Sequence, residues 1–196
     1  MQAYRQHASA SSQRGVKMST YRLVRMAFLS IILYVSQVAL AFLPNIEVVS
    51  LLIVVFTLLY KKDIKYVCAL YVLFTGIQWG FGLWWWSYLV IWPLFSVAVN
   101  LLSGLVKENW FIWTVILGVW GLIFGALFAI PYIFIDPAFA FSYWIAGIPW
   151  DMLHCAGNVL IAAVIGKPVY KALVRIENNN GVNRDHGMHN YLKPWS

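Results

Sequence analysis

Charged residues are scarce in this chain of 196 residues: 11% are Asp, Glu, Lys or Arg, whereas 62% are hydrophobic and 17% are aromatic. A soluble domain of this size cannot bury so much apolar surface. The composition excludes an ordinary soluble domain and predicts an all-α integral membrane protein with the lipid bilayer as its solvent. We expect no nucleic-acid partner.

Cysteine is almost absent, which excludes a framework of disulfides. The two cysteines, Cys68 and Cys155, both lie in apolar runs. His154 precedes Cys155, but neighbours on a helix point about 100° apart and cannot bind one metal ion together. We predict that Cys155 is a small apolar filler and that the chain holds no metal of its own. His154 as a single axial ligand to a metal-containing compound stays open.

Motifs of enzymes are missing as well. The chain has no GxSxG nucleophile turn and no HExxH motif, and Gly166-Lys167 lacks the preceding glycine of a phosphate-binding loop. We therefore predict that the protein is not an enzyme and has no cofactor of its own. Any ATP hydrolysis that it uses must come from partner subunits.

What the chain does have is a series of six apolar runs. These are residues 23–43, 48–60, 66–84, 88–106, 110–135 and 149–174. We predict six transmembrane helices in one membrane domain, residues 21–175, with a disordered basic tail at 1–20 and a polar tail at 176–196. Gly80 and Gly82 predict a turn, and residues 136–147 an aromatic loop.

The distribution of Lys and Arg predicts the orientation. All fourteen lie before residue 26, at 61–65, at Lys107 or from Lys167 onward, and the alternate connections have none. By the positive-inside rule both termini are cytoplasmic, and Glu47, Asp136 and Asp151 lie on the outer side. We expect a multi-pass protein of a prokaryotic plasma membrane.

Two glycine pairs lie in or next to the apolar runs, and one polar hairpin connects the first run to the second. Gly121 and Gly125 have the spacing that lets helices approach closely, as do Gly76 and Gly80. In the hairpin of residues 43–50, Pro44 ends the first run, and Asn45 and Glu47 stand where a second helix begins. This hairpin is either a plain capped connection or the lip of a solute pocket, and both interpretations can hold.

Polar and aromatic residues gather at the outer ends of the runs. Aromatic residues there commonly anchor a protein among lipid headgroups, but polar residues inside spans need a partner or a cavity. Asp151, His154 and Asn158 share one helix face, either as an internal hydrogen-bonded clamp or as a solute-facing stripe. The outer connections lack Lys and Arg, which disfavours small anions and favours neutral or cationic rings.

Three segments carry a family resemblance: the Pro-Asn-Ile-Glu hairpin, Trp-Gly-Phe-Gly-Leu-Trp-Trp, and Ile-Pro-Trp-Asp-x-x-His-Cys. With the basic amino terminus and six short spans, residues 20–175 resemble the substrate-binding S-components of energy-coupling factor (ECF) vitamin transporters. The resemblance implies an S-component-like bundle that captures a vitamin from outside. It implies as partners a transmembrane coupling subunit, docked at Ala27 and Ser30, and two cytoplasmic ATPases.

The resemblance also implies a set of ligand-facing residues: Asn45, Glu47, Gln78, Trp79, Trp85, Tyr88, Tyr143, Trp150, Asp151 and His154. Among the family's substrates, cobalamin is narrowly favoured, because a wide indole-rich mouth and an axial His154 suit a corrin. Thiamine, pyridoxine or a queuosine precursor come next. The alternative, from another class, is a membrane sensor or scaffold that recruits a partner through its tails.

Overall fold

The computed structural model describes residues 19–179, so most of the tails expected at 1–20 and 176–196 lies outside the described residues. Thr20 already begins a helix, and residues 176–179 are helical rather than part of an irregular tail. The described chain is all-helical and contains no strand, as predicted. Its helices are α2 (Thr20–Ala39), α3 (Val49–Tyr60), α4 (Ile64–Trp79), α5 (Leu83–Val106), α6 (Trp110–Ile133), α7 (Pro137–Ile161) and α8 (Lys167–Asn179). A short 3-10 turn, Lys61–Asp63, joins α3 to α4, and a π-helical segment, Ala162–Gly166, joins α7 to α8.

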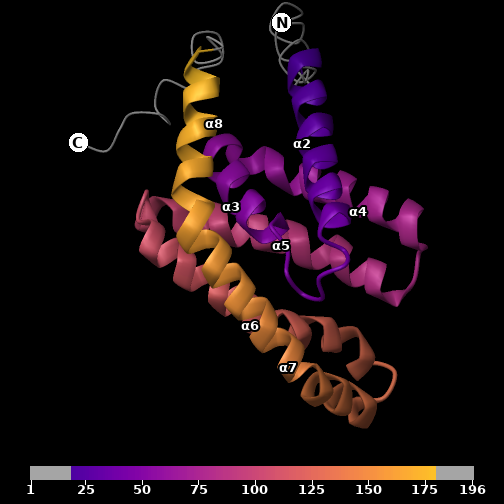
Figure 1. The fold of residues 1–196 in the computed structure, drawn as a ribbon. Helices are drawn as coiled ribbons and strands as arrows, with labels where there is room; N and C mark the ends of the chain where they lie inside the picture. Colours follow the sequence, from indigo (N-terminus) through magenta and orange to yellow (C-terminus); the bar gives the residue numbers. More distant parts are fainter. Residues whose placement is uncertain (1–18, 180–196) are drawn as a thin grey trace, which may run out of the picture.

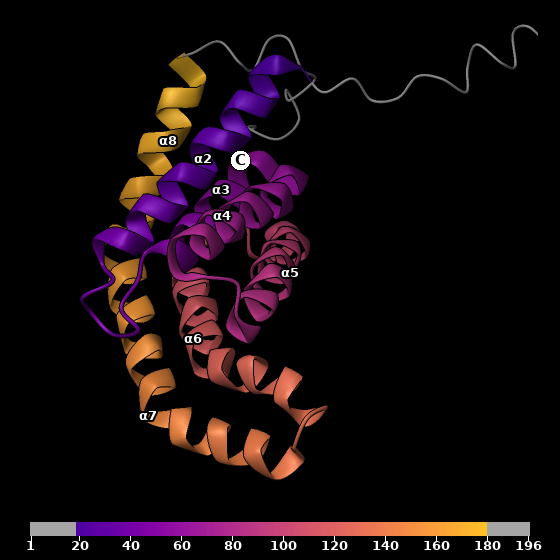
Figure 2. The ribbon, with the colours of Figure 1, turned by 90° about the vertical axis from the view of Figure 1, so that its right-hand side faces the viewer.

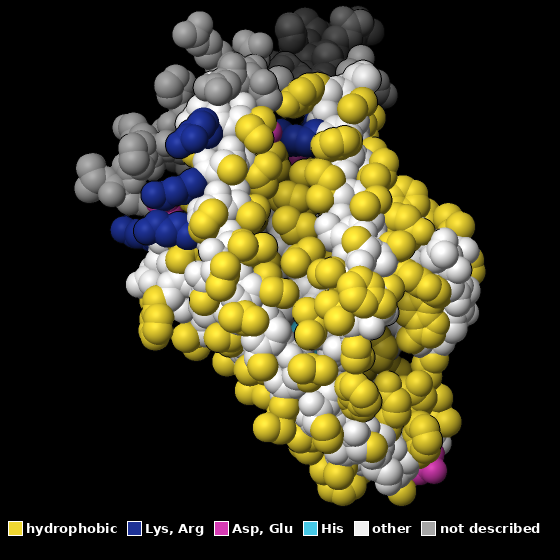
Figure 3. Space-filling view, in the orientation of Figure 1, with side chains coloured by type: hydrophobic (Ala, Val, Ile, Leu, Met, Phe, Trp, Pro, Cys, Tyr) yellow, Lys and Arg dark blue, Asp and Glu magenta, His cyan; other side chains and the backbone are white. Residues whose placement is uncertain are grey.

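Three of the described helices, α2, α5 and α6, are long and apolar enough to cross a membrane, judged by length and composition. Figure 3 shows a face on which hydrophobic side chains dominate, while Lys and Arg gather in its upper part, beside α8 and between α8 and α2. Large apolar side chains such as Leu105 and Phe134 are more than four-fifths exposed. These features are compatible with a membrane protein.

Helix α3 forms the centre of the molecule, with α2 and α8 rising on either side of it (Figure 1). Its sequence is apolar on all sides, which is typical of a helix surrounded by other helices. Ile53, Val54 and Val55 accordingly have no exposed surface. The start of α2 and the end of α8 lie at the same end of the molecule (Figure 1).

A bent hairpin of α6 and α7 extends from this body, as Figure 2 shows. The aromatic loop predicted at 136–147 is wrong, because residues from Pro137 onward are helical. Asp136 caps this helix, since its Oδ1 accepts hydrogen bonds from the backbone N–H groups of Ala138 (2.9 Å) and Phe139 (3.2 Å), and Pro137 suits the first helical position. Pro149 lies inside α7, where a proline bends a helix rather than beginning one.

Glycines on α6 allow α7 to approach it closely. A Cβ added to Gly121 would lie 2.6 Å from the backbone nitrogen of Cys155, and one on Gly125 would collide with the carboxylate of Asp151. The close approach predicted for this pair is confirmed. The pair Gly76 and Gly80 is different: Gly76 lies under aromatic rings rather than a helix, and Gly80 has open space around it. Gly80 instead ends α4 with a positive φ of 88°, and so makes the predicted turn.

A charged cluster joins α2 to the turn after α3. Asp63, which is 7% exposed, pairs with both Arg22 and Arg25, accepting hydrogen bonds of 2.9 Å from Arg22 Nε and 3.1 Å from Arg25 Nη2. The Arg25 guanidinium also lies over the ring of Tyr60, 4.5 Å from its centroid. This cluster ties the first turns of α2 to the turn that follows the central helix.

Candidate functional site

Two neighbouring cavities lie where the hairpin after α2 meets α4, α5, α6 and α7. The first has a volume of about 420 Å³ and the second of about 450 Å³. Asn45, Tyr88 and Phe124 line both of them. Each volume falls within the range usual for small-molecule sites.

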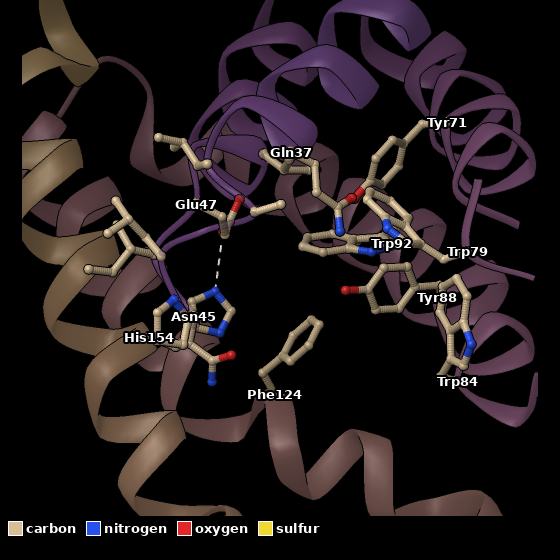
Figure 4. Close-up of a pocket in the computed structure, with 16 residues that line it drawn as sticks. Gln37, Asn45, Glu47, Tyr71, Trp79, Trp84, Tyr88, Trp92, Phe124 and His154 are labelled. Carbon is tan, nitrogen blue, oxygen red and sulfur yellow. Dashed lines mark hydrogen bonds and ion pairs between the residues drawn. The ribbon is translucent and has the colours of Figure 1, made fainter.

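The polar centre of the first cavity is a carboxylate–imidazole pair. Glu47 Oε1 lies 3.2 Å from His154 Nε2, drawn as the dashed line in Figure 4. His154 is 3% exposed, and its ring packs edge-on against Phe124 with centroids 5.0 Å apart. The pair brings together two predicted site residues that are 107 positions apart in the sequence.

The hairpin places Glu47 and Asn45 through different contacts. The other oxygen of Glu47, Oε2, accepts a hydrogen bond of 2.8 Å from the backbone N–H of Ser50 and so caps α3. Helix α3 begins at Val49 rather than near Asn45, so the role predicted for Asn45 at the helix start is wrong. Asn45 instead has a φ of 54° and donates from Nδ2 to the carbonyl of Trp150, 2.9 Å away. The hairpin is therefore both a helix cap and a cavity lip.

Aromatic rings form the opposite wall of the first cavity. Tyr88 packs edge-on against Trp84 and Trp92, with centroids 5.4 and 5.7 Å away, and Figure 4 shows its hydroxyl pointing into the cavity. Trp92 is 2% exposed, and its indole N–H has no hydrogen-bond partner among the described residues. Tyr71 donates a hydrogen bond to Gln37, which fixes that amide beside the rings. The wall thus combines flat apolar faces with a few polar atoms.

The second cavity is lined by Asp151 together with predicted aromatic residues, Tyr143 and Trp150. Asp151 Oδ1 accepts a hydrogen bond of 2.9 Å from the backbone N–H of Gly125 on α6. One and two turns further along α7, His154 reaches the first cavity and Asn158 donates to the carbonyl of Leu117, 3.2 Å away. The shared helix face is confirmed. The internal-clamp interpretation holds for Asp151 and Asn158, while Asp151 and His154 also line cavities.

Of the ten residues predicted to face a ligand, eight line one of the two cavities. They are Asn45, Glu47, Trp79, Tyr88, Tyr143, Trp150, Asp151 and His154. The other two do not. Gln78 is exposed and accepts a hydrogen bond from the Tyr34 hydroxyl, and the Trp85 indole donates to the carbonyl of Val72, 2.7 Å away.

The two residues predicted to dock a coupling subunit have different surroundings. Ala27 is exposed on α2. Ser30 is fully buried, and its hydroxyl donates to the carbonyls of Met26 and Val67. Ser30 therefore holds α2 against α4, and its side chain is not on the surface of the described chain.

Trp85→Phe should separate packing from ligand contact. The change removes the indole hydrogen bond to Val72, and we expect a cost of about 1 kcal/mol in unfolding free energy, with no change in ligand affinity. Thermal unfolding and ligand titration of the purified variant measure the two quantities. A large loss of ligand affinity at unchanged stability would show that Trp85 contacts the ligand after all.

Several cavity residues were not predicted: Gln37, Tyr71, Trp84, Trp92 and Phe124. Gln37 carried a usable signal, because an amide inside an apolar run needs a partner. The aromatic residues did not, since a tryptophan facing a cavity and one facing lipid have the same sequence context.

Within residues 19–179, no group of three or more His, Cys, Asp and Glu could hold a metal ion. Comparisons with family models, with curated proteins and with solved structures found no match to the chain. The resemblance to ECF S-components therefore stays a prediction based on the motifs given above.

Proposed function

We propose that the protein is a membrane-embedded binding subunit that captures a neutral or cationic ring compound, as the S-component of an ECF-type vitamin importer. One observation carries the proposal: a cavity of about 420 Å³ has indole and phenol rings on one wall and the Glu47–His154 pair on the other. Rings of this kind stack on a flat ligand and attract a cation.

The charge of the cavity supports the ligand class. Among the described residues that line it, none is Lys or Arg, so an anionic vitamin would lack its usual charge-assisted partner. Glu47 supplies a negative charge, and the unpartnered indole N–H of Trp92 supplies a donor. The volume favours a thiamine, a pyridoxine or a queuosine precursor over cobalamin, because a corrin with its nucleotide arm is much larger than these rings.

The proposal includes the membrane topology expected from the sequence. Six spans with cytoplasmic termini would use α2 to α7, continued by α8, and would place the hairpin of residues 43–50 on the outer side. The gathering of Lys and Arg beside α8 and α2 in Figure 3 supports this orientation. The coupling subunit and two ATPases would then supply the energy for import, and the chain itself would only bind.

The direct test is mass spectrometry of small molecules released by denaturing the detergent-purified protein. The proposal expects one vitamin-sized compound per chain, neutral or cationic and with an aromatic ring. A protein that releases nothing and binds no compound from a vitamin panel would contradict it. Tail deletions that abolish function would instead support the sensor or scaffold alternative.

Glu47→Gln tests whether the carboxylate in the first cavity contributes to ligand binding. Glutamine keeps an oxygen to cap α3 but removes the negative charge, so affinity for a cationic ring should fall about 10- to 100-fold, equivalent to about 1.5 to 3 kcal/mol. Isothermal titration with thiamine and pyridoxine measures the change. Trp86→Phe is the control, because Trp86 is 59% exposed and lines neither cavity. Unchanged affinity of the Glu47→Gln variant would show that the charge of Glu47 does not contribute to ligand binding.

A further inference from the structure

The second cavity contains a buried carboxylate oxygen without a partner. Asp151 is 5% exposed, and its Oδ1 accepts the Gly125 N–H, but Oδ2 has no hydrogen-bond partner among the described residues. A buried carboxylate oxygen without a donor is costly, because burial removes the water that would otherwise bind it. The missing side chain of Gly125 is what makes room for this carboxylate.

No Lys or Arg of the described chain forms an ion pair with Asp151. The ion pairs that Arg forms among the described residues join Asp63 to Arg22 and Arg25, while the His154 ring lies against Glu47. His154, three residues along α7, thus directs its Nε2 to the first cavity rather than to Asp151. Of the described residues that line the second cavity, none is Lys, Arg or His.

Aromatic rings surround the rest of this cavity. Tyr88, Phe124, Phe128, Tyr143 and Trp150 all line it, and Tyr88 packs edge-on against Phe128 with centroids 5.4 Å apart. The faces of such rings attract cations, and the attraction grows when the cation leaves water. A volume of about 450 Å³ admits a small organic molecule.

We propose that the second cavity is a binding site for a protonated primary or secondary amine with an apolar substituent. The ammonium N–H donates to Asp151 Oδ2, which supplies both the missing donor and the missing positive charge. The substituent lies among the aromatic rings. This inference concerns the second cavity alone and does not rest on the proposed function, which the first cavity carries.

The test uses the full-length protein in detergent micelles, titrated at pH 7 with 2-phenylethylamine and with its neutral counterpart, 2-phenylethanol. The two probes have the same ring and chain, so the comparison isolates the charge. We expect the amine to bind at least tenfold more tightly than the alcohol. Equal affinities would overturn the proposal, because they would show that Asp151 carries no charge that the ligand recognises.

Asp151→Asn tests the carboxylate directly. Asparagine keeps an oxygen to accept the Gly125 N–H, so the contact between α6 and α7 is preserved while the charge is lost. Amine affinity should fall at least tenfold and alcohol affinity should stay the same, with thermal unfolding reporting on the fold. Unchanged amine affinity in a folded variant would overturn the proposal.

Trp150→Leu gives a second route that does not alter the buried carboxylate. Trp150 is 51% exposed, so its replacement leaves the packing largely intact, and amine affinity should fall severalfold. Trp86→Leu, a substitution outside both cavities, should leave amine binding unchanged.

Discussion

Gly121→Val should destabilise the protein more than any other single substitution considered, by about 3 kcal/mol or more in unfolding free energy. A Cβ at this position would meet the backbone nitrogen of Cys155 at 2.6 Å and its Cα at 2.8 Å. Both are backbone atoms of α7, so no side chain can turn aside to make room. The two helices must separate, and valine adds two further methyl groups to the clash.

Thermal unfolding of the detergent-purified protein, followed by size-exclusion chromatography, measures the effect of Gly121→Val. Gly104→Val is the matched control, because Gly104 lies in α5 with nothing within 4 Å of an added Cβ. Valine is a better helix former than glycine, so the control should be neutral or slightly stabilising. Equal stability of the two variants would show that α6 and α7 do not pack as described.

Asp63→Asn should have the second largest effect, about 3 kcal/mol in unfolding free energy. The aspartate pairs with Arg22 and Arg25, whose side chains are 31% and 15% exposed. Asparagine is almost the same size but has no charge, so two partly buried guanidinium groups lose their counter-ion. The partial exposure of Arg22 lets water recover some of the loss, which is why we expect no more than this.

The control for Asp63→Asn is the same substitution at Asp136. Asp136 is exposed and caps α7 through Oδ1, and asparagine caps a helix about as well as aspartate. Chemical unfolding of both variants in mixed micelles should therefore separate them clearly. If Asp136→Asn cost as much as Asp63→Asn, the pairing with two arginines would contribute nothing to stability.

The periodic parts of the fold could be predicted from the sequence because apolar runs and glycine spacing are local signals. The span at 110–135 matches α6 closely, and the turn at Gly80 is where it was expected. The loop predicted at 136–147 was wrong, because its aromatic composition concealed a strong helix start, Asp136-Pro137. Pro149 reinforced the error, since a proline inside a helix and one at its first turn look alike in sequence.

The candidate site was predictable where polar residues stand in apolar surroundings. Glu47, Asp151 and His154 stand out there for that reason, and all three line cavities. The pairing of Glu47 with His154 could not be foreseen, because it depends on how the hairpin meets α7. Trp85 was expected to face a ligand because of the family resemblance, but its contact with Val72 depends on the turn at Gly80–Gly82, which brings the start of α5 back against α4.

The π-helical segment Ala162–Gly166 sets the rotational phase between two parts of one continuous helix. Before it, α7 directs Asp151 and His154 toward the cavities; after it, α8 directs Tyr170 to Trp110 and Glu108, and Glu177 to Tyr60. Removing one residue would restore α-helical spacing and turn α8 by about 100° relative to α7. If α7 then kept its residues at the cavities, α8 would lose the contacts of Tyr170 and Glu177. If α8 kept those contacts, α7 would turn Asp151 and His154 away from the cavities. This segment should therefore accept changes of side chain far more readily than changes of length.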